Sequence, residues 1–204
     1  LRRCPIIGKN RSCPPCSPCD LVSGWGGAGA FSDGKLTLSP QVGGQLKAYL
    51  GTDKAADLIH YVDDIYLKFG APSEVYGAGT EVEQLSQKAK KAGLRLIPAP
   101  IRHMGTESCR EVLRDMHKYL ADRIESQTDT AAVSLLRQNG RIKGIQTDDG
   151  QRIESRYLII APGREGADWL LKEAGRLGLT LHNNPIDVGV RVEVPITVLQ
   201  ELTD

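Results

Sequence analysis

Four of the five cysteines lie near the start of the chain, and their spacing is the first feature that predicts chemistry. The pattern C-x8-C-x2-C-x2-C joins Cys4, Cys13, Cys16 and Cys19. Thiolates at intervals of three residues are typical of iron–sulfur ligation, and zinc takes the same ligands where the C-x2-C steps form turns. Zinc or an iron–sulfur cluster is therefore a candidate cofactor, with reduced thiols or a disulfide between neighbours as the alternatives.

A glycine-rich loop follows the cysteines. Residues 24–29, GWGGAG, satisfy the dinucleotide fingerprint G-x-G-x-x-G. That fingerprint acts between a hydrophobic strand and a helix, whereas here Cys-Pro repeats precede it and residues 31–40 are poor helix material. The missing side chains still permit a flat or anionic ligand to approach the backbone, and Lys35 adds a positive charge. A ligand loop and a flexible surface turn both remain open.

The composition of the whole chain sets the limits for these features. The chain has 204 residues, of which 40% are hydrophobic, and a formal net charge of +1. Without a long basic run, nothing favours nucleic acid or an anionic membrane as a partner. No apolar run approaches the ~18 residues of a membrane span, and no signal peptide is apparent, which predicts a cytoplasmic protein. Because the first residue is leucine rather than methionine, we expect a fragment of a longer protein.

Four helices are predicted from the periodicity of apolar residues. They cover residues 53–69, 81–92, 106–122 and 166–177. The first has Thr52 as its expected N-cap and Gly70 as its stop, and Gly93 and Gly178 end the second and fourth. Cys109 shares helical spacing with the apolar stripe of the third helix, which favours an inert core thiol over a reactive one.

Strands are predicted mainly in the second half of the chain. Residues 94–100 are expected to form one short strand. Residues 131–156 contain the turn pairs Asn139-Gly140 and Asp149-Gly150 between alternating runs, which predicts a three-stranded meander. The apolar run at 157–161 is then expected to be a buried parallel strand, and residues 187–194 a final alternating strand. The predicted fold class is α/β.

Five segments of the chain resemble one protein family. They are SGWGGAGAFSDGKLTLSP, KFGAPSEVYG, PIRHMGTE, YLIIAPGREGADW and NNPIDVGVRVEVP. In order and approximate spacing they resemble the bacterial FAD-dependent dehydrogenases, mostly uncharacterised FAD/NAD-dependent oxidoreductases. The resemblance covers nearly the entire chain. It implies an internal fragment that lacks the family's N-terminal GxGxxG unit and its C-terminal part.

The resemblance also implies an organisation and a cofactor. The fold would be a partial FAD-binding Rossmann-like domain with a β-meander and a helical insertion on the substrate side. Residues 1–40 would form the Cys-rich and Gly-rich cofactor region, 41–122 the insertion, 123–178 the meander and late FAD motif, and 179–204 the start of a substrate domain. The implied FAD contacts are Gly26, Gly27, Ala28, Gly29, Ser32, Asp33, Gly34, Lys35, Ala161, Pro162, Gly163 and Arg164.

The expected activity is hydride or electron transfer by FAD on a small-molecule substrate, with NADH or NADPH as a candidate hydride donor and a homodimer as a candidate assembly. Arg102, His103 and Arg191 are the candidate substrate residues, and a structural hydrogen-bonding role is the alternative for each. We expect this chain alone to hold no FAD tightly. The alternative functions are a metal-binding electron-transfer module and a substrate- or partner-binding domain without chemistry of its own.

Overall fold

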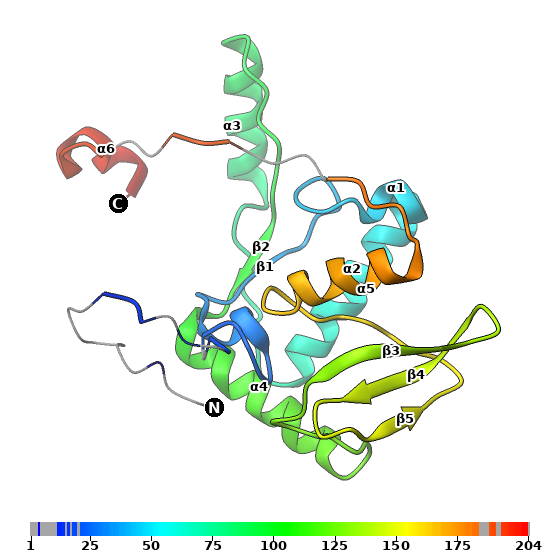
Figure 1. Ribbon diagram of the computed structural model, residues 1–204. Coiled ribbons are helices and arrows are strands. Elements are labelled where there is room, and N and C mark those ends of the chain that lie inside the picture. The colour runs from blue at the N-terminus through cyan, green and yellow to red at the C-terminus, as the bar shows by residue number, and fades with distance from the viewer. Residues whose placement is uncertain are drawn as a thin grey trace.

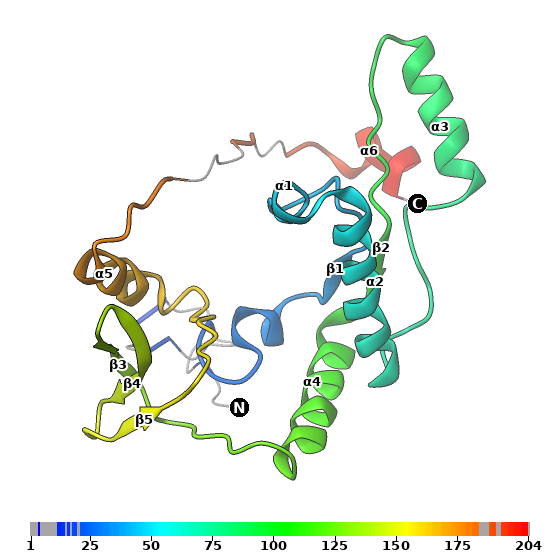
Figure 2. The same ribbon diagram turned by 90° about the vertical axis from the view of Figure 1, so that its right-hand side faces the viewer.

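A computed structural model describes residues 4, 12–14, 16, 18–19, 21–183, 188–190 and 193–203. Its elements form a mixed α/β structure with two small antiparallel sheets. Figures 1 and 2 show one body built on α2 and α4 and a second built on the three-stranded sheet, joined by residues 122–131. Among the described residues, no helix combines the length and the apolar character that a membrane span requires.

The first body contains four α-helices, a 3-10 helix and two short strands. In chain order these are η1 (Gly27–Phe31), β1 (Lys35–Thr37), α1 (Leu46–Leu50), α2 (Thr52–Lys68), α3 (Thr80–Lys91), β2 (Ile101–His103) and α4 (Gly105–Ala121). The three predicted helices in this part are confirmed as α2, α3 and α4. Thr52 is not the N-cap of α2, because the chain turns between α1 and α2 at Gly51, whose φ of 80° suits glycine, and the helix begins directly after it.

The two strands of the first body pair antiparallel, with Leu36 opposite Arg102. The predicted strand at 94–100 is wrong, since the hydrogen-bonded strand begins only at Ile101. Pro98 and Pro100 have no N–H group and so cannot donate to a ladder. Residues 94–100 instead run back along α3, which projects from the body in Figure 1.

The core of the first body lies between α4, α2 and β1. Its buried members are Ala71, Met104, Cys109 and Val112. The partly buried side chains around them are Leu36, Tyr66, Phe69, Leu113 and Met116. The predicted apolar stripe of α4 is thus confirmed, and its most buried residue is Val112.

The second body is the predicted meander with one helix. Its elements are β3 (Ala132–Gln138), β4 (Arg141–Thr147), β5 (Arg152–Glu154) and α5 (Ala167–Leu177). The strand order is β3-β4-β5, and α5 contacts β3. The tight turn at Asn139-Gly140 is confirmed, with φ of 52° and 77°. At Gly144 a Cβ would lie 1.9 Å from the carbonyl oxygen of Ile153, so β4 and β5 can approach this closely only beside a glycine.

The buried strand expected at 157–161 is wrong. These residues are irregular, and Tyr157 and Ile159 are 78% and 92% exposed. A strand needs a hydrogen-bonding neighbour, and no described segment pairs with this run. An apolar composition alone therefore does not make a buried strand.

The C-terminal part contains α6 (Ile196–Thr203), and the described residues 179–183 directly after α5 are irregular. Of the strand expected at 187–194, the structure describes residues 188–190 and 193–194, and these are irregular. Val188 and Val190 are exposed, so they have no layer to pack against. The rest of that expected strand lies outside the described residues.

Candidate functional site

The glycine loop is held against α4 by contacts distant in sequence. The indole N–H of Trp25 donates to the carbonyl oxygen of Leu113 over 3.0 Å, and its ring meets the His117 ring edge-on at 4.9 Å. The thiol of Cys109 donates to the carbonyl oxygen of Gly29 over 3.3 Å. The loop is therefore an ordered part of the first body, although none of the described residues before it forms a strand.

The glycines of this loop serve two different purposes. At Gly26 a Cβ would lie 2.8 Å from Cδ1 of Leu113, and at Gly34 it would lie 3.1 Å from the Cβ atoms of Cys109 and Met104. Both glycines permit close packing on α4. At Gly29 a Cβ would meet nothing within 4 Å, and Ala28 beside it is also exposed. Residues 28–29 are thus one accessible stretch of the predicted cofactor loop, in which Gly26, Ser32, Asp33 and Lys35 are exposed as well.

The end of the loop leads into β1 through local hydrogen bonds. The Ser32 hydroxyl donates to the carbonyl oxygen of Gly29 over 3.0 Å and accepts from the N–H of Gly34 over 3.1 Å. The Asp33 carboxylate and the Lys35 ammonium are 2.7 Å apart. The hydrogen bond from Lys35 is the main reason that the pKa of Asp33 is lowered, and the nearby His103 contributes a smaller electrostatic effect.

The pairing of β1 with β2 joins the cofactor loop to two of the substrate candidates. Lys35 lies directly opposite His103, and Leu36 opposite Arg102. Directly opposed residues have side chains on the same face of a sheet. Lys35 and His103 therefore form an exposed basic pair next to the Asp33 carboxylate.

Arg102 has a structural role in this arrangement. Its side chain is only 4% exposed, and its Nε and Nη2 donate to the two carboxylate oxygens of Asp63, each over 2.6 Å. Its Nη1 donates to the carbonyl oxygen of Pro72 over 2.6 Å. These bonds direct the guanidinium toward α2 and the chain that follows it. Arg102 therefore anchors β2, the strand that carries His103, to α2.

Sequence reasoning did not identify Asp63. A signal was available, because Asp63 lies four residues after Ile59 and eight after Ala55, on the inward face of α2. A carboxylate on such a face is rarely buried without a partner, which would have predicted a buried cation opposite it.

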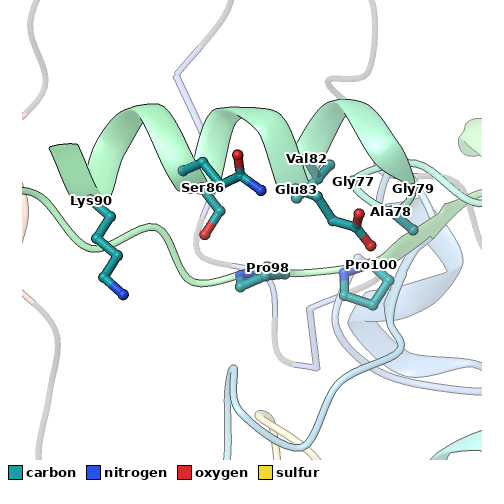
Figure 3. A pocket seen from close by; sticks show the side chains of 10 residues that line it. Gly77, Ala78, Gly79, Val82, Glu83, Ser86, Lys90, Pro98 and Pro100 are labelled. Carbon is teal, nitrogen blue, oxygen red and sulfur yellow. The ribbon is translucent and has the colours of Figure 1, made fainter. Parts of the chain in front are cut away.

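Among the described residues, hollows of the first body's surface include one beside α3 and one beside α2. One of about 540 Å³ lies between α3 and the returning chain and is lined by Val82, Glu83, Ser86, Lys90, Pro98 and Pro100 among others. Figure 3 shows its charged side chains, Glu83 and Lys90, toward opposite ends of the hollow. The other, also about 540 Å³, lies between β1 and α2 and includes Lys35 in its lining. Only this second hollow adjoins the predicted site residues.

The second set of predicted cofactor residues lies before α5. Ala161, Gly163 and Arg164 are exposed, and Pro162 packs against Gly166, where a Cβ would lie 2.4 Å from that of Pro162. At Gly163 itself a Cβ would meet nothing within 4 Å. The hydrogen bonds of this turn lead into α5, whereas those of the glycine loop lead to α4 and β2.

In the part of the chain that the structure describes, the cysteines of this pattern do not gather around one point where a metal ion could bind. Cys13 and Cys16 are exposed, and no disulfide joins any of the five cysteines. Among the described residues, no three His, Cys, Asp or Glu side chains are grouped so as to hold a metal ion. The metal site at Cys4, Cys13, Cys16 and Cys19 stays a prediction. Arg191 lies outside the described residues.

Cys109 is buried in the core, as its position on the stripe of α4 predicts. Burial raises the pKa of its thiol, which disfavours the reactive thiolate.

No protein-family model matches the chain, and no curated protein matches its sequence.

Proposed function

We propose that this chain forms part of an FAD-dependent oxidoreductase site, in which residues 28–29 of the glycine loop approach the cofactor and the β1–β2 pair faces the substrate. The proposal begins from the resemblance of five segments to FAD-dependent dehydrogenases. The chain order of the second body is compatible with it, since the meander is followed by the small-residue turn 161–163 and then α5, although the strand expected before that turn does not form.

The observation that carries the proposal is the pairing of Lys35 with His103. It brings the end of the loop expected to bind FAD next to a residue expected on the substrate side, although the two residues are far apart in the sequence. A flavin site needs both functions at one place, because the cofactor and the substrate must meet for hydride transfer.

The open space beside Gly29 fits a flat cofactor. A ligand can approach the backbone there because no side chain fills the position and nothing lies within 4 Å of a Cβ built on it. FAD supplies the hydride or electron chemistry when it is bound. The chain's own groups orient it, and His103 is the side chain placed to exchange a proton with a substrate. NADH or NADPH as the hydride donor belongs to the same proposal.

The test is a titration of the isotope-labelled chain with FAD, followed through the amide signals in NMR spectra. We expect weak, saturable shifts centred on Ala28 and Gly29. The variant Gly29→Val should weaken binding at least about tenfold, equal to about 1.4 kcal/mol. It should leave the fold intact, since the added side chain enters open space.

Gly175→Ala is the matched control, because a Cβ there also meets nothing within 4 Å but lies on α5. It should bind FAD as the parent chain does. Shifts that are absent, that are confined to other regions, or that survive Gly29→Val unchanged would refute this placement of the cofactor.

A further inference from the structure

An apolar groove lies beside the basic pair, between β1 and α2. Its cavity of about 540 Å³ falls within the range of small-molecule sites, roughly 300–1,000 Å³. The apolar side chains that line it include Leu36, Leu38, Leu46, Leu58, Ile59 and Val62.

The groove gathers apolar side chains that the core does not use. Leu46, Leu58 and Val62 are 44%, 39% and 45% exposed, and Tyr61 at the same groove is 63% exposed. Single exposed apolar residues are common, but a group of them around one hollow indicates a binding surface. The core face of α2 is distinct from this surface, since Tyr66 packs on the cluster around Val112.

The polar groups of the groove are few and unequal in availability. Asp63 lines it, but both of its carboxylate oxygens are bound by Arg102. Lys35 shares one ion pair with Asp33, and an ammonium group has three protons to donate. His103 lies directly across from Lys35. Of these charged residues, only Lys35 and Asp63 line the groove, and Lys35 is therefore its one cation among the described lining residues.

We propose that this groove binds a small carboxylic acid, with its apolar body against Leu58 and Val62 and its carboxylate on Lys35. An apolar lining that includes the Lys35 cation complements an amphiphilic anion in both polarity and charge. The groove's role as the substrate pocket rests on the proposed flavin function, whereas its ability to bind a carboxylic acid does not.

The experiment uses decanoate as the probe and decanol as its uncharged match, both below the concentration at which they aggregate. Binding to the labelled chain is followed through the methyl signals of Leu58 and Val62 and the amide signal of Lys35, with no flavin present. We expect saturable shifts of all three signals with decanoate, and weaker binding of decanol.

Two variants separate the parts of the site. Lys35→Met should weaken the binding of decanoate roughly two- to fivefold, as expected for a partly exposed ion pair, and should leave the binding of decanol unchanged. Leu58→Gln should weaken the binding of both probes by about tenfold, because apolar contact is lost. The controls Lys88→Met and Leu85→Gln on α3 should change neither, because these residues do not line the groove.

Three results would overturn the proposal. The first is that decanoate shifts the signals of residues outside the groove. The second is that the α3 control variants weaken decanoate binding as much as the groove variants do. The third is that the signals of Leu58 and Val62 shift with protein concentration alone. The last result would assign the groove to a second copy of the chain. FAD shifts at Ala28 and Gly29 are a separate readout, so failure of the groove is distinguishable from failure of the flavin proposal.

Discussion

The two bodies each contain an arginine bound to a buried carboxylate, but the two pairs hold different parts of the structure. In the first body Arg102 binds Asp63, which is 39 residues away, and joins β2 to α2. In the second body Arg176 binds Glu173, which is 3 residues away on α5. The first pair stabilises a tertiary contact, whereas the second is formed within one helix.

The pair that joins distant segments is also the more deeply buried of the two. Arg102 and Asp63 are both buried, at 4% and 8% side-chain exposure, whereas Arg176 is 49% exposed and only Glu173 is buried. Removal of one residue from a buried ion pair leaves the other charge unpaired and away from water. The first body therefore depends strongly on its ion pair.

The second pair has an additional role at the edge of the sheet. Glu173 accepts the N–H of Leu135 over 2.7 Å, and Arg176 donates to the carbonyl oxygen of the same residue. Leu135 lies on β3, an edge strand of the three-stranded sheet. The two side chains of α5 thus take the hydrogen bonds that a further strand would make, which blocks this position to edge pairing.

The largest effect is expected from Arg102→Met. It should cost about 3–5 kcal/mol of unfolding free energy, because Asp63 remains buried without its partner. Urea unfolding can be followed for each body separately through tryptophan fluorescence. Trp25 is hydrogen-bonded to α4 in the first body, and Trp169 is hydrogen-bonded to β3 in the second. In Trp169→Phe and Trp25→Phe backgrounds, only the Trp25 signal should shift.

The control for this prediction is the double variant Asp63→Leu with Arg102→Met. It should recover most of the lost stability, since apolar residues of similar size replace a buried pair well. Equal shifts of the Trp25 and Trp169 transitions would show that the two bodies unfold as one unit and would remove the distinction between them.

A smaller effect is expected from Glu173→Ala. It should cost about 1–3 kcal/mol, because the buried N–H of Leu135 loses its acceptor. The change should appear in the Trp169 transition and leave the Trp25 transition in place. Glu165→Ala, an exposed position before α5, is the matched control and should have no comparable effect.

The same carboxylate predicts a pH dependence. The hydrogen bond from Arg176 is the main reason that the pKa of Glu173 lies below its ordinary value of 4.5. The stabilisation is therefore complete above that ordinary value and is lost as the pH falls through the lowered pKa of the folded state. In Glu173→Gln the Trp169 transition should depend less on pH in this acid range, and an unchanged slope would contradict the assignment.

The smallest effect concerns thiol reactivity and does not require a change in stability. Cys109 is buried and its thiol pKa is raised by that burial, whereas Cys13 is exposed. Iodoacetamide should modify Cys13 in the native chain and leave Cys109 unmodified until the first body unfolds. Peptide mass analysis measures both sites. In Arg102→Met the modification of Cys109 should accelerate, and rapid modification in the parent chain would show that the first core opens readily.

Local patterns predicted helices α2 to α5 and the tight turn of the meander. The apolar spacing of α2, α4 and α5 and the pair Asn139-Gly140 depend on residues close in sequence, whose conformations follow from helix periodicity and glycine's access to positive φ. The glycine stop of α5 at Gly178, with φ of 72°, belongs to the same class.

The errors arose where a structure needs a distant partner. The run at 157–161 has the composition of a buried strand, yet composition does not supply a neighbouring strand to accept its hydrogen bonds. Residues 94–100 failed for a related reason, because two prolines remove donors from the ladder.

By itself, the sequence determined helices α2, α3, α4 and α5, the meander and the inward position of Cys109, because each follows from spacing within a few residues. Only the tertiary structure decided that Arg102 belongs to Asp63, and that Lys35 and His103 meet across β1 and β2. Those contacts depend on strand register and helix packing between distant segments. Many registers satisfy the same apolar pattern, and the one that forms also satisfies the buried charge of Asp63.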